Sequence, residues 1–169
     1  MTSEARMHRP SRRSRAEARR RGGLSPVTVA LREARQDERN LIEQLLSQYL
    51  LEFDGRTDEY PGLDAYWEDS DRQPLLIEAG GEVVGLCLIR HRKTGWGIAE
   101  FWVQSDRRRC GVGRAAVEAI AQRGRAAGAD FLEAKIHPAN RKASSFWLAV
   151  GFSRAEDPGT GVIVTRRPL

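Results

Sequence analysis

The sequence has too few cysteines and histidines to suggest a metal centre or a disulfide framework. Its 169 residues include two cysteines and three histidines. Cys87 and Cys110 form no C-x-x-C pair, and no group of cysteines and histidines has the spacing of a zinc site. We therefore expect no metal ion, and the pattern favours a reduced, cytoplasmic environment.

Long hydrophobic runs are also missing. The longest candidates, such as residues 83–89, have the length of a strand, whereas a membrane-spanning helix needs about 20 apolar residues. Hydrophobic residues make up 40% of the chain and charged residues 30%, which is typical of a soluble globular protein. We expect one domain with one core and no membrane contact.

The net charge of +5 comes from one end of the chain. Residues 1–26 hold eight arginines and two glutamates, a balance of +6, out of 28 basic and 23 acidic residues in all. Residues 27–169 therefore carry 20 basic and 21 acidic residues, a balance of −1. Because residues 1–26 have no hydrophobic face to bury, we expect a disordered basic tail before the folded domain.

Three interpretations of this tail stay open. It could contact nucleic acid or an anionic surface through counterion release. It could also be a solvated extension, or sequence upstream of a start at Met7. Arg12 and Arg13 form a twin arginine, but no hydrophobic segment follows them, so an export signal is not expected.

Hydrophobic periodicity predicts a mixed α/β sheet with helices on both faces. Strands are expected at residues 27–32, 75–79, 82–90, 97–103, 131–136, 152–156 and 161–166. One helix should follow Asp37, a candidate N-cap, and end near Gly55. Two more should run from the glycine-containing loop to about residue 127, and from Asn140 to Gly151. Residues 56–73 are expected to be irregular, with a short helix at most.

The segment 103–114, V-Q-S-D-R-R-R-C-G-V-G-R, joins a predicted strand to a predicted helix. Gly111 and Gly113 would let the backbone approach a ligand closely, and the helix N-terminus presents N–H groups to an anion. Three arginines add positive charge: Arg108, Arg109 and Arg114. A pyrophosphate would suit such a site, although a tight strand-to-helix turn alone could also use these glycines.

Two better-known phosphate loops do not match. A Walker loop needs G-x-x-x-x-G-K-[ST], which is absent. A Rossmann loop needs G-x-G-x-x-G after the first strand of its unit, whereas residue 116 is alanine and this loop follows four predicted strands.

Two motifs, at residues 108–113 and 140–152, resemble those of the GNAT acetyltransferases. Residues 108–113, R-R-C-G-V-G, match the cofactor-loop pattern [Q/R]-x-x-G-x-[G/A], and the interval from Val103 to Gly111 keeps the family spacing. Residues 140–152, N-R-K-A-S-S-F-W-L-A-V-G-F, match the pattern N-x-x-[AS]-x-x-[FL]-[YW]-x-x-x-G-F. The resemblance covers about residues 27–169. Some short segments are also similar to sequences of a small bacterial branch of the family.

This resemblance implies a mostly antiparallel sheet of six to seven strands with a central parallel pair. It implies transfer of an acetyl group from acetyl-CoA to a primary amine by direct attack on the thioester. The N–H groups of residues 110–114 would hold the pyrophosphate, the backbone of Trp102 and Val103 would pair with the pantetheine arm, and an N–H near Val103 would polarise the thioester oxygen. The implied cofactor-binding residues are Trp102, Val103, Arg108, Arg109, Cys110, Gly111, Val112, Gly113, Arg114, Asn140 and Ser144. Asn140 could instead serve only as a helix cap.

The sequence also offers candidate catalytic groups. Glu100, three residues before Val103, is the best-placed general base, although it could simply pair with a basic strand residue. The family's tyrosine acid is replaced by Trp147, which cannot donate such a proton. A thiol with a pKa of roughly 8–9 is a good leaving group without a dedicated acid. Water, Tyr49 or Tyr60 could act instead, and Tyr49 is taken as the second catalytic candidate.

The acceptor should meet residues 52–71. These contain eight acidic residues and one arginine, Arg56. The predicted substrate-binding residues are Phe53, Tyr60, Trp67 and Trp147. Negative charge among aromatic side chains favours a cationic amine, although an ordinary solvated loop would have a similar composition.

Two other functions stay open. The domain could bind acyl-CoA as a sensor or interaction module with little catalysis. The tryptophan at position 147 favours this alternative. More weakly, the tail could bring the domain to nucleic acid or ribosomes. The sequence allows a monomer or a homodimer.

Overall fold

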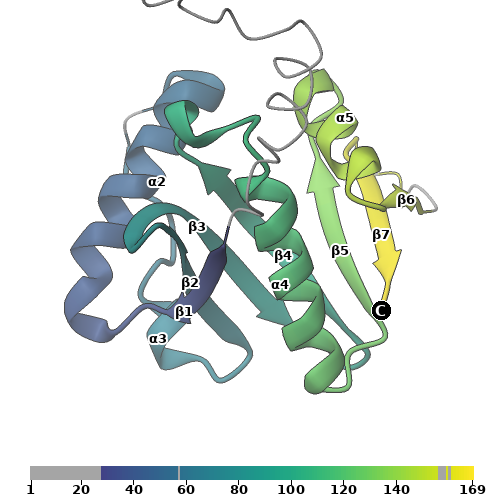
Figure 1. Ribbon diagram of the computed structural model, residues 1–169, viewed down its shortest axis with the longest axis horizontal. Coiled ribbons are helices and arrows are strands. Elements are labelled where there is room, and N and C mark those ends of the chain that lie inside the picture. The colour runs from purple at the N-terminus through teal and green to yellow at the C-terminus, as the bar shows by residue number, and fades with distance from the viewer. Residues whose placement is uncertain (1–27, 57, 156–158, 160) are drawn as a thin grey trace, which may run out of the picture.

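The computed structural model describes residues 28–56, 58–155, 159 and 161–169. The predicted tail, residues 1–26, therefore lies outside the described residues. Seven strands form one sheet in the order β1-β2-β3-β4-β5-β7-β6 (Figure 1). The strands are β1 (Val29–Glu33), β2 (Arg72–Ala79), β3 (Glu82–His91), β4 (Gly95–Val103), β5 (Phe131–Ile136), β6 (Ser153–Arg154) and β7 (Ile163–Pro168).

The helices lie between these strands. They are η1 (Gln36–Glu38), α2 (Arg39–Asp54), α3 (Ala65–Glu68), η2 (Ser105–Arg107), α4 (Val112–Ala126) and α5 (Arg141–Ala149), where η marks a 3-10 helix. Only β4 and β5 are parallel among the described strands, and every other neighbouring pair is antiparallel. This arrangement confirms the predicted mixed sheet with a central parallel pair.

Alternating side chains place a hydrophobic cluster on each face of the sheet. On one face Leu76, Leu86 and Leu88 pack against buried residues of α2, including Ile42 and Leu46. On the other face, α4 and α5 cover the sheet. The core residues of that second face include Leu75, Cys87, Ile89, Ile98, Val117, Ile120, Leu132 and Trp147. The helix α4 lies over β4 in the view of Figure 1.

The helix α4 shows why the sequence folds in this way. Its buried residues include Val112, Ala116, Val117, Ile120 and Ala121, which recur at helical spacing along one side. Gly128, with a φ of 77°, follows its carboxyl end, where the left-handed conformation favours glycine. The predicted stop near this glycine is confirmed.

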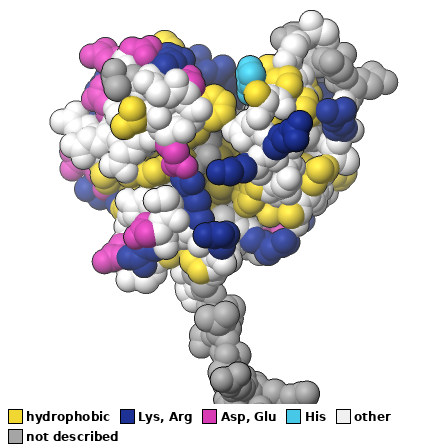
Figure 2. Space-filling view, turned by 90° about the horizontal axis from the view of Figure 1, so that it is seen from above, with side chains coloured by type: hydrophobic (Ala, Val, Ile, Leu, Met, Phe, Trp, Pro, Cys, Tyr) yellow, Lys and Arg dark blue, Asp and Glu magenta, His cyan; other side chains and the backbone are white. Residues whose placement is uncertain are grey.

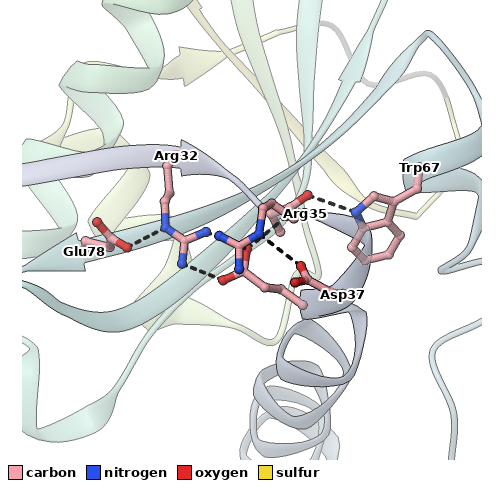
Figure 3. A network of polar contacts seen from close by, with 7 residues as sticks. Arg32, Arg35, Asp37, Trp67 and Glu78 are labelled. Carbon is pink, nitrogen blue, oxygen red and sulfur yellow. Dashed lines mark hydrogen bonds and ion pairs between the residues drawn. The ribbon is translucent and has the colours of Figure 1, made fainter.

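The end of α2 nearest β1 is fixed by an ion network, not by the predicted Asp37 cap. Arg32 of β1 donates through Nη1 and Nη2 to Glu38 at 2.6 and 2.7 Å, and through Nε to Glu78 of β2 at 2.6 Å (Figure 3). Asp37 lies within η1, and its carboxylate accepts from Arg35 at the surface. The prediction of Asp37 as N-cap was wrong, because Glu38 and not Asp37 accepts from the Arg35 N–H, at 3.0 Å, and from Arg32 at this turn.

Other element boundaries shift by a few residues. β2 begins at Arg72, three residues before the predicted start, and β4 begins at Gly95, two residues earlier than predicted. The strand predicted at 152–156 is reduced to Ser153–Arg154, and residue 156 lies outside the described part. The short helix in the irregular stretch is α3, whose Tyr66 is buried.

Replacing Glu38 with glutamine should lower the free energy of unfolding by about 1–2 kcal/mol at pH 7. Hydrogen bonding from Arg32 lowers the pKa of Glu38 to about 2, and its side chain is 13% exposed. A lowered pKa stabilises the fold above the unfolded value of about 4.3, and this stabilisation is lost as pH falls toward about 2. Urea titrations should therefore show a wild-type advantage at pH 7 that disappears near pH 2.

The matched control is Asp37→Asn. Asp37 is 73% exposed and its ion pair with Arg35 is at the surface, so this change should stay within about 0.5 kcal/mol of the wild type. Equal losses in both variants would contradict the assigned role of Glu38.

Candidate active site

The strands β4 and β5 separate halfway along their length. Their pairing runs from Gly95, opposite Phe131, to Ile98, opposite Ala134, and it stops there within the described part of the chain. Figure 1 shows the two strands diverging toward their carboxyl ends. From residue 99 to residue 103, β4 therefore has a strand partner on the β3 side only, among the residues that the structure describes.

The pairing of β4 with β3 determines which backbone N–H and C=O groups of β4 point to this open edge. Gln104 N–H donates to Val84 O at 2.9 Å, so residue 104 directs its backbone toward β3. Because antiparallel pairs alternate, Trp102 also points toward β3, whereas Phe101 and Val103 direct their N–H and C=O groups to the open side. Of the two residues predicted to pair with an extended ligand, Val103 faces the opening and Trp102 does not.

A bulge in β4 decides which face Glu100 occupies. The register shifts so that Leu88 opposes Glu100 while Ile89 opposes Ile98, which leaves Ala99 as the extra residue. Ile98 packs in the cluster under α4, but Ala99 packs in the cluster under α2. Without the extra residue, Glu100 would point to the same face as Ile98. The bulge therefore directs Glu100 toward α2.

The loop after β4 has a backbone suited to an anion. Arg109 has a φ of 59° and Gly111 a φ of 95°, so the chain turns through the left-handed region twice before α4. Gly111 is the N-cap of α4 and provides no side-chain cap. The first helical bond in this turn runs from Ala115 N–H to Gly111 O at 3.0 Å. The N–H groups of residues 112–114 are consequently available at the positive end of the helix.

Side chains around this loop support the same interpretation. Arg109 and Arg114 are exposed, and neither forms an ion pair within the described part of the chain. Figure 2, turned to look onto this end of the molecule, shows lysine and arginine side chains across the middle of the surface and acidic ones mainly on the left of the view. Gly113 lies close to α5, because a Cβ there would come 3.1 Å from Phe146.

The start of α5 borders the opening from the β5 side. Asn140 accepts a hydrogen bond from Ala143 N–H at 3.0 Å, so it is a helix cap. Ser144 donates from Oγ to Asn140 O at 3.3 Å. The amide nitrogen of Asn140 is not needed for the cap, which leaves it able to contact a ligand.

Glu100 lies among phenolic hydroxyl groups. Tyr60 donates to Glu100 Oε1 at 3.0 Å, and Tyr49 of α2 also hydrogen-bonds this carboxylate. Burial raises the pKa of Glu100, and the hydrogen bonds from Tyr60 and Tyr49 lower it only in part. Burial and the neighbouring Glu100 charge raise the pKa values of both tyrosines, so both hydroxyls stay protonated near neutral pH.

These features coincide with what a comparison of the chain with protein families finds. The model of the Acetyltransferase (GNAT) family matches residues 38–152. The chain belongs to the GNAT acetyltransferase family. Acetyl-CoA is the acyl donor of this family, and the open β4 edge with its anion-binding loop suits an extended ligand that ends in a pyrophosphate.

Solved structures of GNAT proteins share the fold. An acetyltransferase from Thermus thermophilus is 23% identical with a TM-score of 0.69, over 85% of this chain and 99% of that one. The PaiA N-acetyltransferase from Thermoplasma acidophilum, solved with coenzyme A, is 12% identical with a TM-score of 0.67, over 84% and 99%. The ribosomal-protein-S18-alanine N-acetyltransferase from Escherichia coli is 14% identical with a TM-score of 0.64, over 83% and 94%. No curated protein sequence matches the chain.

The predicted acceptor residues do not all lie together. Tyr60 contacts Glu100, and Phe53, 41% exposed, stacks on Tyr49 with ring centroids 5.8 Å apart. Trp67 instead donates from Nε1 to Ala34 O at 2.9 Å, which fixes α3 near the network of Figure 3. Trp147 is buried among three other aromatic rings: Phe101, Phe146 and Phe152.

Most acidic residues of the stretch 52–71 already have basic partners. The ion pairs are Glu52–Arg108, Asp54–Arg56, Asp58–Arg56, Asp64–Arg39, Asp69–Arg72 and Asp71–Arg72. Glu59 and Glu68 form no ion pair with any described residue. The negative field expected from eight acidic residues is therefore largely neutralised locally.

Sequence reasoning missed two features of the GNAT site. It did not find the bulge at Ala99, because a bulge is visible only when two strands are placed in register. It also counted Glu52 among the acceptor-side charges, although Glu52 reaches Arg108 across 56 positions of sequence. No local signal marks such a long-range pair.

Replacing Gly111 with glutamate should abolish acetyl-CoA binding. The new carboxylate would lie at the positive end of α4, where it would occupy and repel the anion site, and a side chain at a φ of 95° is strained. Isothermal titration calorimetry measures the effect, and thermal melting checks that the variant is folded.

The control is Gly128→Glu. Gly128 has a φ of 77° and follows the opposite end of α4, so it has similar backbone strain away from the loop. Binding should match the wild type. Unchanged binding in Gly111→Glu would show that the loop is not the pyrophosphate site.

Proposed function

We propose that this protein transfers an acetyl group from acetyl-CoA to a primary amine by direct attack of the amine on the thioester. The observation that carries the proposal is the position of Glu100. A carboxylate with a raised pKa lies on β4, three residues before Val103, on the strand whose open edge leads to the anion-binding loop. Acid–base chemistry and donor binding would thus share one strand.

The donor would be held along this strand and its loop. The N–H groups of residues 110–114 would bind the pyrophosphate, with Arg109 and Arg114 adding positive charge. Phe101, through its N–H and C=O, and Val103, through its N–H, would pair with the pantetheine arm, as an added strand does. Asn140 and Ser144 would border the arm from α5. When bound, acetyl-CoA supplies an activated acyl group and a thiol leaving group.

Glu100 would remove the proton from the attacking amine. A carboxylate with a raised pKa holds a proton more readily than an ordinary glutamate, which suits a general base working near neutral pH. The hydroxyls of Tyr60 and Tyr49 orient the carboxylate while it is charged. Phe101 and Val103 direct N–H groups to the open edge, where one of them can stabilise negative charge on the thioester oxygen.

The proton for the departing thiol would come from Tyr49 or from water. Tyr49 is half-buried on α2, and its hydroxyl stays protonated near neutral pH. Trp147 has no part in this step, because it is packed in the core. A thiol also leaves without a dedicated acid, so protonation of the thiol depends less on a particular side chain than deprotonation of the amine does.

The acceptor we propose is a primary amine, in particular a cationic small molecule or a basic peptide. Glu59 supports this choice, because it is an exposed acidic residue beside Tyr60 and forms no ion pair with a described residue. A cytoplasmic location and a monomeric or dimeric state stay predictions. No helix within the described residues is long and apolar enough to cross a membrane.

A catalytically weak acyl-CoA sensor is the second candidate. One observation favours it: the family's usual tyrosine position holds Trp147, and that side chain is buried. A turnover assay with a panel of amines, read as release of free coenzyme A, separates the candidates. Binding of acetyl-CoA without release for any amine would support the sensor.

Glu100→Gln should lower kcat/KM by about 100-fold or more, because the amine loses its base. The raised pKa of Glu100 means that wild-type activity falls as pH drops through that pKa, and the glutamine variant should lack this acid limb. Tyr60→Phe removes a hydrogen bond that lowers this pKa, so its acid limb should move to higher pH. The measurement is a pH–rate profile of each enzyme.

The control for Glu100→Gln is Glu33→Gln on the exposed edge strand β1, which should keep the wild-type profile. A Glu100→Gln enzyme with full kcat/KM across the pH range would rule out Glu100 as the base.

Glu59→Lys should raise KM for a dicationic amine about two- to tenfold, because charge near the entrance acts on encounter and binding. Its effect on kcat should be small, and higher salt should reduce the difference from the wild type. Asp64→Asn is the control, since Asp64 is already paired with Arg39 at 2.5 Å. A best acceptor that is neutral or anionic would overturn the cationic choice.

A further inference from the structure

Arg108, expected from the motif to face the cofactor, is already paired with groups of the protein itself at the surface. Its Nη1 and Nη2 donate to Glu52 Oε1 and Oε2 at 2.5 and 2.6 Å, and its Nε donates to Val103 O at 2.7 Å. All three guanidinium nitrogens therefore have an acceptor. The same guanidinium carbon lies 6.0 Å from the centroid of the Trp102 ring.

Glu52 is the centre of this cluster. It extends from the last turn of α2, receives both terminal nitrogens of Arg108, and accepts a further hydrogen bond from Trp102 Nε1 at 3.0 Å. One carboxylate thus joins a helix on the acceptor side, the end of β4 and the cofactor loop. Hydrogen bonding from Arg108 lowers the pKa of Glu52 to about 2, so Glu52 stays charged throughout the range of an enzyme assay.

The cluster fixes a carbonyl at the open edge. Val103 O belongs to the outward-facing backbone groups of β4, and the loop begins directly after it. With Arg108 held by two bonds to Glu52, its Nε cannot move away from Val103 O without breaking the bidentate pair. The end of β4 and the start of the loop are therefore held together before a donor arrives.

We propose that Glu52 is a positioning residue for donor binding, which acts through Arg108 to hold the end of β4 and the loop 104–111 in the shape that receives the pyrophosphate. This inference rests on the proposed function, because it assumes that the loop binds acetyl-CoA. In this proposal Arg108 supports the shape of the loop, and Arg109 and Arg114 attract the charge of the pyrophosphate directly.

The competing role for Arg108 is a direct phosphate ligand. In that case Glu52 would compete with the donor for the guanidinium, and removing the carboxylate charge would tighten binding. A positioning role predicts the opposite sign, since a loop that must be ordered during binding weakens it. The direction of change therefore separates the two roles.

The experiment is a double-mutant cycle with Glu52→Gln and Arg108→Gln, measured as the Kd for acetyl-CoA by calorimetry. Glutamine at 52 keeps an acceptor for Trp102 but loses the charge, and glutamine at 108 is the alternative that the family motif allows. Each single variant should bind about three- to tenfold more weakly, and the double variant no more weakly than the worse single one. KM for acetyl-CoA should rise by the same factor while kcat stays within about twofold.

Two further variants make the test specific. Arg108→Lys keeps the charge but loses the planar fork, so a positioning role predicts a loss similar to that of Arg108→Gln, whereas near wild-type binding would point to charge alone. Asp58→Asn removes one negative charge from the same stretch but breaks only a surface pair with Arg56, and it should leave Kd unchanged.

The outcomes are distinguishable. Tighter or unchanged binding by Glu52→Gln, in a variant that melts like the wild type, would overturn the positioning role. A wild-type protein that does not bind acetyl-CoA would instead defeat the proposed function itself. Because Glu52 stays charged, its effect should not change between about pH 6 and 9, unlike that of Glu100.

Discussion

The open edge of β4 is the constraint on which the rest of the site depends. Parallel pairing with β5 lasts from Gly95 to Ile98 and then stops, although β5 continues to pair with β7 as far as Ile136 opposite Ile163. A strand that loses its neighbour inside a sheet exposes N–H and C=O groups that need partners. Phe101 presents both groups toward the gap and Val103 presents its N–H, whereas Val103 O already accepts from Arg108, so the edge remains a binding surface for an extended ligand.

Packing keeps this gap from closing. Phe101 stacks on Phe146 with centroids 5.6 Å apart and meets Trp147 edge-on at 5.5 Å, so α5 places large rings against β4 where the strands part. Trp147 thus has a structural reason to be large and apolar, whatever donates the proton to the thiol. Gly113 allows the first turn of α4 to approach Phe146 closely, which brings the anion-binding end of the helix beside the same gap.

The sequence predicted those features of the fold that depend on interactions between residues close together in the chain. Alternation located the strands of the sheet, and the glycines at 111, 128 and 151 marked helix ends because each adopts a positive φ. The N-terminal boundary of α2 could not be found in this way, since it depends on Arg32 reaching Glu38 and Glu78. The face occupied by Glu100 depends on a bulge set by strand register, and two acidic residues of the stretch, Glu52 and Asp64, pair with arginines distant in sequence. These features exist only after the chain has folded.

Glu52 and Glu100 are the same residue type, but their surroundings give their carboxyl groups different pKa values and different roles. Both lie near β4, yet the pKa of Glu52 is lowered to about 2 while that of Glu100 is raised. Glu52 meets a guanidinium that stabilises its charge, whereas Glu100 is half-buried and its hydrogen bonds come from neutral hydroxyls. A carboxylate that cannot take up a proton near neutral pH is suited to hold a structure together. A carboxylate whose charged form is disfavoured is suited to accept a proton. Glu52 therefore provides a fixed charge at the end of β4, and Glu100 provides a group in the middle of β4 that can exchange a proton.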